Sequence, residues 1–85
     1  MERERLIEII ENTESEYTKG IDNAYEGLRI LAQYSHIVLQ GAEHDIIYSI
    51  DVDDIIDTIT EEEAIQLAKY GWFIDSDADC MAHFI

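Results

Sequence analysis

The sequence contains no proline, a single cysteine and only five basic residues. Average usage of roughly 5% would place about four prolines in a chain of this length, so proline-rich linkers are excluded. The lone Cys80 has no partner for an internal disulfide, and no apolar run approaches the length of a membrane span. Residues 1–5 also lack the apolar stretch of a secretory signal, so we expect a cytoplasmic protein.

Acidic residues outnumber basic ones by twenty to five, which gives a net charge of −15. Residues 1–35 hold eight acids and four bases, whereas residues 36–85 hold twelve acids and one base, Lys69. Ordinary binding to nucleic acid or to an anionic membrane needs clustered lysine and arginine, so it is excluded. The charge favours a basic partner, a cation, or both.

Two helices are expected in the first part of the chain. Apolar residues recur at helical spacing over residues 2–11 and predict a short amphipathic helix. A capping box formed by Thr13 and Glu16 predicts a second helix over residues 14–34, although one helix over residues 2–34 is an alternative. The apolar stripe of the second helix consists of Tyr17, Ile21, Ala24, Leu28 and Leu31.

Gly20 and Gly27 lie seven residues apart and share a face of this second helix. A glycine inside a helix costs about 1 kcal/mol relative to alanine, so a close contact should offset that cost. We expect the contact to be with the protein's own sheet. The alternative is a homodimer formed through the helix at residues 14–34.

The second half of the chain is expected to form two hairpins separated by helical segments. β-Branched and aromatic residues indicate the strands. A capping box at Thr60 and Glu63 starts a helix that Gly71 ends. The expected elements are strands at 36–40, 45–50, 72–75 and 80–85, a short helical turn at 51–57 and a helix at 61–70, with connections at 41–44 and 76–79.

The element order α-α-β-β-(α)-α-β-β lacks a repeated parallel strand–helix–strand unit, so it predicts a single acidic α+β domain over residues 1–85. The N-terminal helices should pack, with one further helix, on one face of an antiparallel four-stranded sheet. The predicted core consists of Leu6, Ile10, Ile21, Leu28, Leu31, Val38, Ile47, Ile65, Leu67, Trp72 and Phe84.

Two patterns resemble metal sites but depart from them in detail. The Asp-x-Asp-x-Asp run of residues 75–79 matches the opening of a calcium-binding loop, yet its sixth position is Cys80 instead of the required glycine. Cys80, His83, His36 and His44 offer zinc ligands, but Cys80 and His83 would point to opposite faces of a strand. We therefore expect no metal and no cofactor.

Patterns of catalysis are also missing. The sequence has no glycine-rich phosphate loop and no metalloprotease or hydrolase motif. Cys80 beside a histidine is a conceivable nucleophile, but the acidic surroundings should raise the pKa of its thiol and suppress the reactive thiolate. We predict that the protein is not an enzyme.

The acids of the second half are the main functional signal. Asp75, Asp77 and Asp79 are two residues apart, a step of about 6.6 Å in an extended strand. Successive phosphates on a DNA strand are separated by about 6–7 Å, so rows of carboxylates can occupy the phosphate sites of a nucleic-acid-binding protein. The predicted partner-binding residues are Asp51, Asp53, Asp54, Asp57, Glu61, Glu62, Asp75, Asp77 and Asp79.

In size, charge and these carboxylates, the chain resembles the small phage-encoded inhibitors that mimic DNA, such as anti-CRISPR and anti-restriction proteins and the uracil-DNA glycosylase inhibitor. This is a functional class without a common fold, so the resemblance implies nothing about architecture. It implies a non-catalytic inhibitor in the host cytoplasm that binds the basic nucleic-acid channel of a host defence protein. A CRISPR effector is the favoured target.

Two other interpretations stay open. One is a helix-mediated oligomerisation protein with a solubilising acidic surface, and the other is an acidic chaperone of a basic nucleic-acid-binding protein. A salt titration distinguishes an apolar dimer from the inhibitor and the chaperone. Affinity for a basic partner should fall steeply as salt screens the charges, whereas an apolar dimer should hardly respond.

Overall fold

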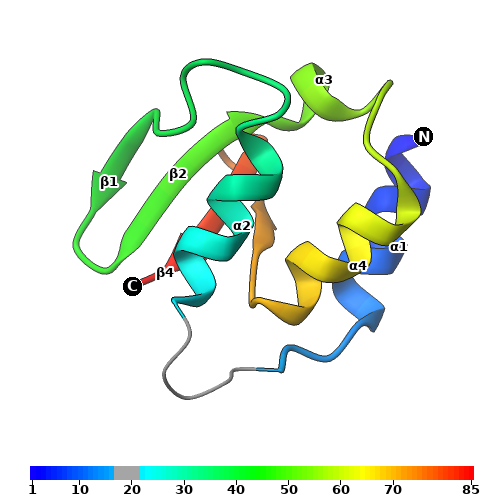
Figure 1. Cartoon of the computed structure of the whole chain (residues 1–85), viewed down its shortest axis with the longest axis horizontal. Coiled ribbons are helices and arrows are strands. Elements are labelled where there is room, and N and C mark those ends of the chain that lie inside the picture. The colour runs from blue at the N-terminus through cyan, green and yellow to red at the C-terminus, as the bar shows by residue number, and fades with distance from the viewer. Residues whose placement is uncertain (17–21) are drawn as a thin grey trace.

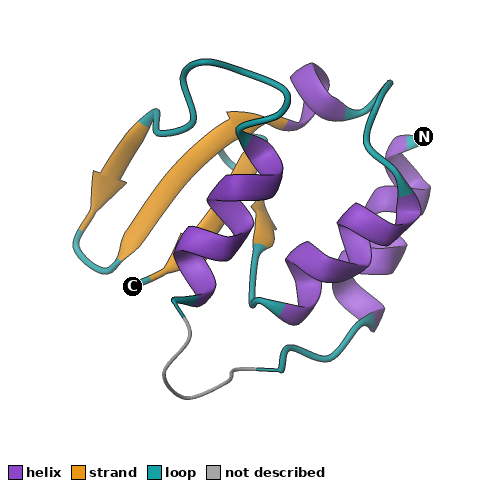
Figure 2. Cartoon of the chain, viewed as in Figure 1, coloured by secondary structure: helices purple, strands orange, loops and turns teal. Residues whose placement is uncertain are grey.

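The computed structural model describes residues 1–16 and 22–85 and has the predicted order of elements. In this part of the chain, four helices and an antiparallel four-stranded sheet confirm the α+β class (Figures 1 and 2). The elements are α1 (Arg3–Asn12), α2 (Asn23–Leu31), β1 (Gly41–Glu43), β2 (Ile46–Asp51), α3 (Val52–Ile55), α4 (Glu61–Lys69), β3 (Phe73–Asp75) and β4 (Cys80–Phe84).

The strands are ordered β1-β2-β4-β3, and each neighbouring pair is antiparallel. The last strand in sequence, β4, therefore lies inside the sheet between β2 and β3. Figure 1 shows α2 crossing in front of the sheet and α1 packed beside α4 at one end of the molecule. This arrangement brings the N-terminal helix close to the acidic second half of the chain.

The core lies between the helices and one face of the sheet. Ile21 lies outside the described residues, and the assignment of Phe84 to the core is wrong. Phe84 is 52% exposed because it pairs with Ile46 on the sheet face opposite to the buried Met81. The other predicted core residues are buried (Leu6, Leu31, Leu67, Trp72) or partly buried against the core (Ile10, Leu28, Val38, Ile47, Ile65).

Both ends of α4 form as predicted. The Thr60 hydroxyl accepts a hydrogen bond from the Glu63 amide, and the Glu63 carboxylate accepts one from the Thr60 amide, each at 3.1 Å. Lys69 lies in the last turn, near the negative end of the helix dipole. Gly71 follows with a φ of 87°, a left-handed conformation that glycine adopts readily.

The second helix is shorter than the prediction of residues 14–34. α2 begins at Asn23, where the Asp22 carboxylate accepts a hydrogen bond from the Tyr25 amide at 3.0 Å. It ends at Leu31. Aspartate at this position satisfies an amide that has no partner within the helix, so Asp22 acts as the start signal.

The capping box expected at Thr13 and Glu16 does not form. Thr13 instead ends α1, donating its amide to the Ile9 carbonyl, and the Glu16 amide donates to the Lys69 carbonyl at 2.6 Å. The tertiary bond to the end of α4 thus uses the donor that a helix start would need. The alternative of one helix over residues 2–34 is excluded as well.

Gly27 makes its close contact inside its own chain. A Cβ added to Gly27 would lie 1.8 Å from Trp72 Nε1, and the Trp72 indole donates to the Asn23 carbonyl at 3.4 Å. The expected contact is therefore made within the chain, but with Trp72, which directly precedes β3, and not with a strand of the sheet. Tyr17, Gly20 and Ile21, which belong to the same predicted stripe, lie outside the described residues.

The first hairpin is shifted along the chain relative to the prediction. Residues 36–40 are irregular, and β1 occupies most of the expected loop at 41–44, with a two-residue turn at 44–45 leading into β2. The first turn residue has a φ of 48°, as tight hairpin turns require. Before β1, side-chain bonds such as that from the Ser49 hydroxyl to the Val38 carbonyl replace strand pairing.

A bulge in β2 decides which of its side chains face the core. Tyr48 pairs with Ala82 and Asp51 pairs with Cys80, so three steps along β2 match two steps along β4. The extra residue allows Ile50 to enter the core while Asp51 stays on the opposite face.

Candidate partner-binding surface

The nine predicted acids lie on neighbouring segments of the fold. α3 and the β3–β4 turn are in direct contact, because the Val52 amide donates to the Asp79 carbonyl at 3.0 Å. Asp51 ends β2, Asp53 and Asp54 lie on α3 with Asp57 just after it, Glu61 and Glu62 begin α4, Asp75 ends β3, and Asp77 and Asp79 lie in the β3–β4 turn.

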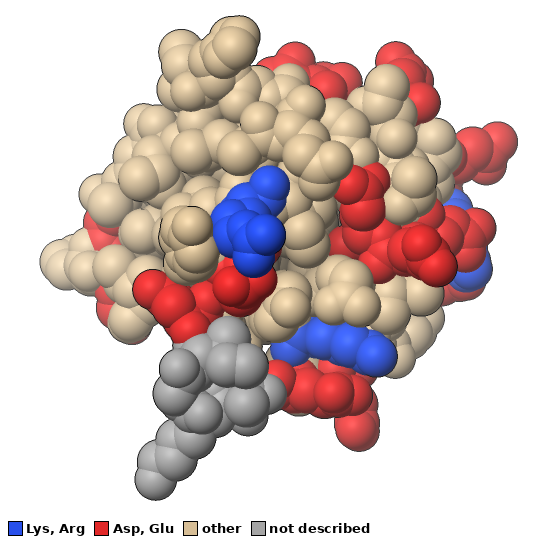
Figure 3. Space-filling view, in the orientation of Figure 1, with Lys and Arg blue, Asp and Glu red and all other residues tan. Residues whose placement is uncertain are grey.

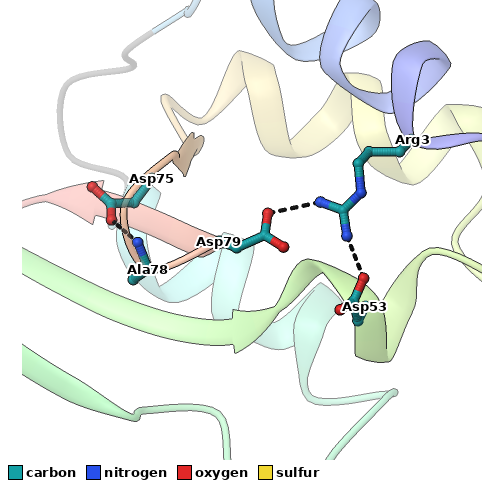
Figure 4. Close-up of polar contacts among 5 residues, drawn as sticks. All are labelled: Arg3, Asp53, Asp75, Ala78 and Asp79. Atoms are coloured by element: carbon teal, nitrogen blue, oxygen red, sulfur yellow. Dashed lines mark hydrogen bonds and ion pairs between the residues drawn. The ribbon is translucent and has the colours of Figure 1, made fainter.

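Arg3 of α1 joins α3 to this turn. Its Nη1 lies 2.7 Å from Asp79 Oδ1 and its Nη2 contacts Asp53; Figure 4 shows the guanidinium between the two carboxylates. The hydrogen bond with Asp79, together with the charges of both carboxylates, raises the pKa of Arg3 above its usual value. The arginine thus bridges the two segments through their carboxylates.

Arg5 links α1 to the start of α4 in the same way. Its Nη2 lies 2.6 Å from Glu61 Oε1, and its Nη1 contacts Glu8. The hydrogen bond from Arg5 lowers the pKa of Glu61. The side chains of Arg5 and Glu61 are 45% and 55% exposed, so the pair contributes little to stability, but it cancels one surface charge.

We call the surface made by Asp53, Asp54, Asp57, Glu61, Glu62 and Asp79 the acidic band. Its carboxylates reach solvent, since the Asp53 side chain is 77% exposed and that of Asp79 is 49% exposed. In Figure 3, acidic side chains gather over the part of the molecule where Figure 1 places α1, α3 and the start of α4. Arg3 and Arg5 offset two of the band's charges, so it stays strongly negative.

The extended row expected for Asp75, Asp77 and Asp79 is wrong. Asp75 ends β3, and the next two aspartates lie in a tight turn. The Asp75 carboxylate accepts a hydrogen bond from the Ala78 amide at 2.8 Å, and Asp79 has a φ of 54° (Figure 4). The turn replaces the strand-like step of about 6.6 Å with a compact cluster.

Asp51 and Asp75 lie on either side of Cys80 across the sheet. Cys80 is free and buried. Its burial, followed by the charges of Asp75 and Asp51, raises the pKa of its thiol. The predicted direction is confirmed, and a protonated thiol is a poor nucleophile.

The structure does not bring the four candidate zinc ligands together. Cys80 and His83 lie three residues apart on β4, and His83 Nε2 is 2.8 Å from the Tyr70 carbonyl oxygen. His36 and His44 are exposed in the α2–β1 connection and the β1–β2 turn. Among residues 1–16 and 22–85, no three His, Cys, Asp or Glu side chains gather where they could hold a metal ion.

Sequence reasoning missed several residues of this surface. Arg3 is separated from Asp53 and Asp79, and Arg5 from Glu61, by 50 or more residues, and no local pattern marks such a pair. Glu43 was assigned to a loop because the hairpin was predicted out of register. It belongs to a hollow of about 390 Å³ that is lined by Glu43, Tyr48, Asp75, Asp77 and Ala78.

Comparison with protein-family models, curated proteins and solved structures found no match. Within the described part of the chain, none of the helices has the length and apolar character needed to cross a membrane.

Proposed function

We propose that this chain is a non-catalytic inhibitor that binds the basic nucleic-acid channel of a host defence protein, with a CRISPR effector as the favoured target. The acidic band carries the proposal, because it gathers exposed carboxylates from α3, α4 and the β3–β4 turn on a chain of net charge −15. Carboxylates in a basic channel would replace DNA phosphates and release counterions from both surfaces.

The arginine bridges add a second argument. Arg3 holds Asp53 and Asp79 from separate segments, and Arg5 holds Glu61. Fixing the carboxylates before binding lowers the ordering cost of association. The two arginines thus neutralise part of the charge of the acidic band, and in return they hold its carboxylates in a defined arrangement.

The helix-mediated oligomer draws less support from the structure. Leu31 of the α2 stripe is buried in the core, and Leu28 packs against that core. These side chains already have partners inside the chain. The acidic chaperone shares the electrostatics of the inhibitor and differs from it in the identity of the partner.

The test is a competition experiment with two matched variants. The band variant Asp54→Asn/Asp57→Asn/Glu62→Gln and the control variant Glu11→Gln/Glu14→Gln/Glu16→Gln each remove three negative charges from exposed residues. The protein is used to capture its partner from host extract, the partner is identified, and labelled duplex DNA then competes for it.

We expect the wild type to displace DNA and the band variant to bind at least about tenfold more weakly than the control variant. Raising the salt concentration should weaken binding steeply. Equal losses in both variants would reduce the effect to bulk charge. Absence of competition at saturating protein would overturn the proposed function.

A further inference from the structure

The two faces of the sheet carry different side chains. Residues that pair directly across antiparallel strands lie on the same face. Ile74 pairs with Met81 on the face that packs against the core. On the other face, Tyr48 and Phe73 both pair with Ala82.

We call the surface formed by Ile46, Tyr48, Phe73 and Phe84 the open sheet face. In the described part of the chain, none of these four side chains belongs to the core or to the residues packed against it. Phe84 is 52% exposed, and Ile46, Tyr48 and Phe73 are partly exposed. This is an apolar surface on a chain that is otherwise strongly charged.

The aromatic residues of the open sheet face are already arranged as a platform. The rings of Phe73 and Phe84 stack with centroids 5.0 Å apart and planes inclined by 29°. Cys80 and Ala82 lie on the same face and are 2% and 0% exposed. The larger side chains around them therefore shield these two residues from solvent. Rigid, partly exposed aromatic side chains are typical anchors of protein interfaces.

Carboxylates surround one end of this platform. Glu43 pairs with Ile46, Asp75 pairs with Cys80, and both line the hollow of about 390 Å³ with Tyr48 and Asp77. A cation in this hollow would lie among the carboxylates of Glu43, Asp75 and Asp77 and beside the ring of Tyr48. Carboxylates and aromatic rings are the groups that bind arginine and lysine side chains.

We infer that the open sheet face binds a protein segment in which arginine or lysine lies next to large apolar side chains. The cationic side chain enters the hollow beside Tyr48, and the apolar side chains pack on Phe73 and Phe84. The inference rests on the proposed function in one respect, namely that the partner is basic, and it adds a binding surface separate from the acidic band.

Charge complementarity selects this occupant over the others. A second copy of the chain also carries −15 and would bring its own Glu43, Asp75 and Asp77 toward the same hollow. Nucleic acid and anionic lipid carry negative charge, as do the carboxylates that line the hollow. A basic segment with apolar side chains complements both these carboxylates and the aromatic platform.

The test uses the isotope-labelled full chain and two peptides of equal length and charge, one alternating Arg with Leu and the other alternating Arg with Ser. We expect the Arg–Leu peptide to cause saturable shifts in the amide resonances of Tyr48, Phe73 and Phe84 and to bind about tenfold more tightly than the Arg–Ser peptide. Phe84→Ser should remove most of that difference. The matched control Ile37→Ser, at an apolar residue that is 70% exposed, should leave it unchanged.

Equal affinity for the two peptides, or shifts confined to the acidic band, would overturn the inference. So would concentration-dependent self-association that Phe84→Ser abolishes, because the occupant would then be a second copy. The band variant Asp54→Asn/Asp57→Asn/Glu62→Gln should keep the peptide site while losing competition with DNA. Competition with DNA therefore tests the proposed function, and peptide binding separately tests the inference about the open sheet face.

Discussion

On one face of the sheet, Ile74 and Met81 lie against the helices, and Met81 is fully shielded from water. On the other face, Phe73 and Phe84 stack in partial exposure, and acidic side chains line a hollow beside Tyr48. Both faces arise from the same alternation of side chains along β3 and β4. The apolar residues of a strand therefore do not reveal by themselves whether they lie in the core or at the surface. The helices that cover one face of the sheet decide it.

Truncating an aromatic residue on each side should give the largest contrast. Trp72 is 2% exposed in the core, so Trp72→Ala should lower the free energy of unfolding by about 3–5 kcal/mol. Phe84→Ala should cost about 1 kcal/mol, the value of an aromatic pair at a surface. Urea unfolding followed by circular dichroism measures both, because the first variant lacks the only tryptophan. Equal losses would show that Phe84 belongs to the core.

Two glycines sharpen the same contrast. Gly27→Ala places a Cβ 1.8 Å from Trp72 Nε1, and overpacking should cost about 1–3 kcal/mol, more than the gain in helix propensity. Gly41→Ala is the control, since its Cβ would have no atom within 4 Å, and its stability should stay near that of the wild type. Thermal and urea unfolding of the two variants provide the comparison. A stabilised Gly27→Ala would mean that α2 does not approach Trp72.

Varying pH separates repulsion from specific contacts. From pH 7 to about 5, partial protonation should relieve the repulsion among the carboxylates and raise Tm. Arg5 lowers the pKa of Glu61, whereas burial acts to raise that of Glu63 but is outweighed by hydrogen bonds from Tyr34 and Thr60.

Both glutamates thus have a pKa below the usual 4.5 in the folded chain. The stability that they contribute is present above about pH 4.5 and is lost as pH falls further. We expect a Tm maximum near pH 5, measured by thermal unfolding in buffers of equal ionic strength. A Tm that falls steadily from pH 7 to 5 would show that ion pairs outweigh repulsion.

Arg3→Gln tests whether the arginine bridge gives up charge for order. The change frees Asp53 and Asp79 and makes the acidic band more negative. We expect a modest gain in affinity for a basic partner at low salt and a loss at higher salt, where the charge is screened and the freed carboxylates still have to be ordered. The open sheet face should change little. Competition with DNA at several salt concentrations measures the first effect, and titration with the Arg–Leu peptide measures the second. Weaker binding at every salt concentration would show that fixed geometry matters more than charge.

The smallest expected effect concerns Tyr34, on the helix-covered side. Its burial and its hydrogen bond to Glu63 raise its pKa to about 12, above the ordinary value of about 10. Its contribution to stability is therefore complete below about pH 10 and is lost as pH rises toward 12. Tyrosinate absorbance should show a late phase near pH 12 that Tyr34→Phe reduces, although the pKa of Tyr48 is raised as well. A variant that loses absorbance only near pH 10 and keeps the whole late phase would contradict the assignment.

Much of the secondary structure could be predicted because its signals are local. Thr60 and Glu63 satisfy each other's backbone amides within one turn, and Gly71 adopts the conformation that its position requires. The predicted helix over residues 14–34 failed because the Glu16 amide bonds to a distant carbonyl. The net charge and its concentration in the second half also follow from the sequence alone.

The surface could be predicted only as a set of residues. Asp53 and Asp79 are acids in the sequence, but the fold alone brings them to Arg3, which is 50 and 76 residues away. Tyr48 and Glu43 gave no signal because the predicted hairpin register was wrong and the bulge after Tyr48 leaves no mark in composition.

The α+β class, the order of the elements, the ends of α4 and the acidic charge follow from the sequence, because periodicity and capping act within a few residues and charge follows from composition. The strand order β1-β2-β4-β3, the close contact of Gly27 with Trp72, the arginine bridges and the exposure of Phe84 follow only from the folded chain. Each of these depends on which distant segments approach one another. Side chains along a strand alternate between two faces that are equivalent until the chain folds. Helices then pack against one face, and the other stays open to solvent.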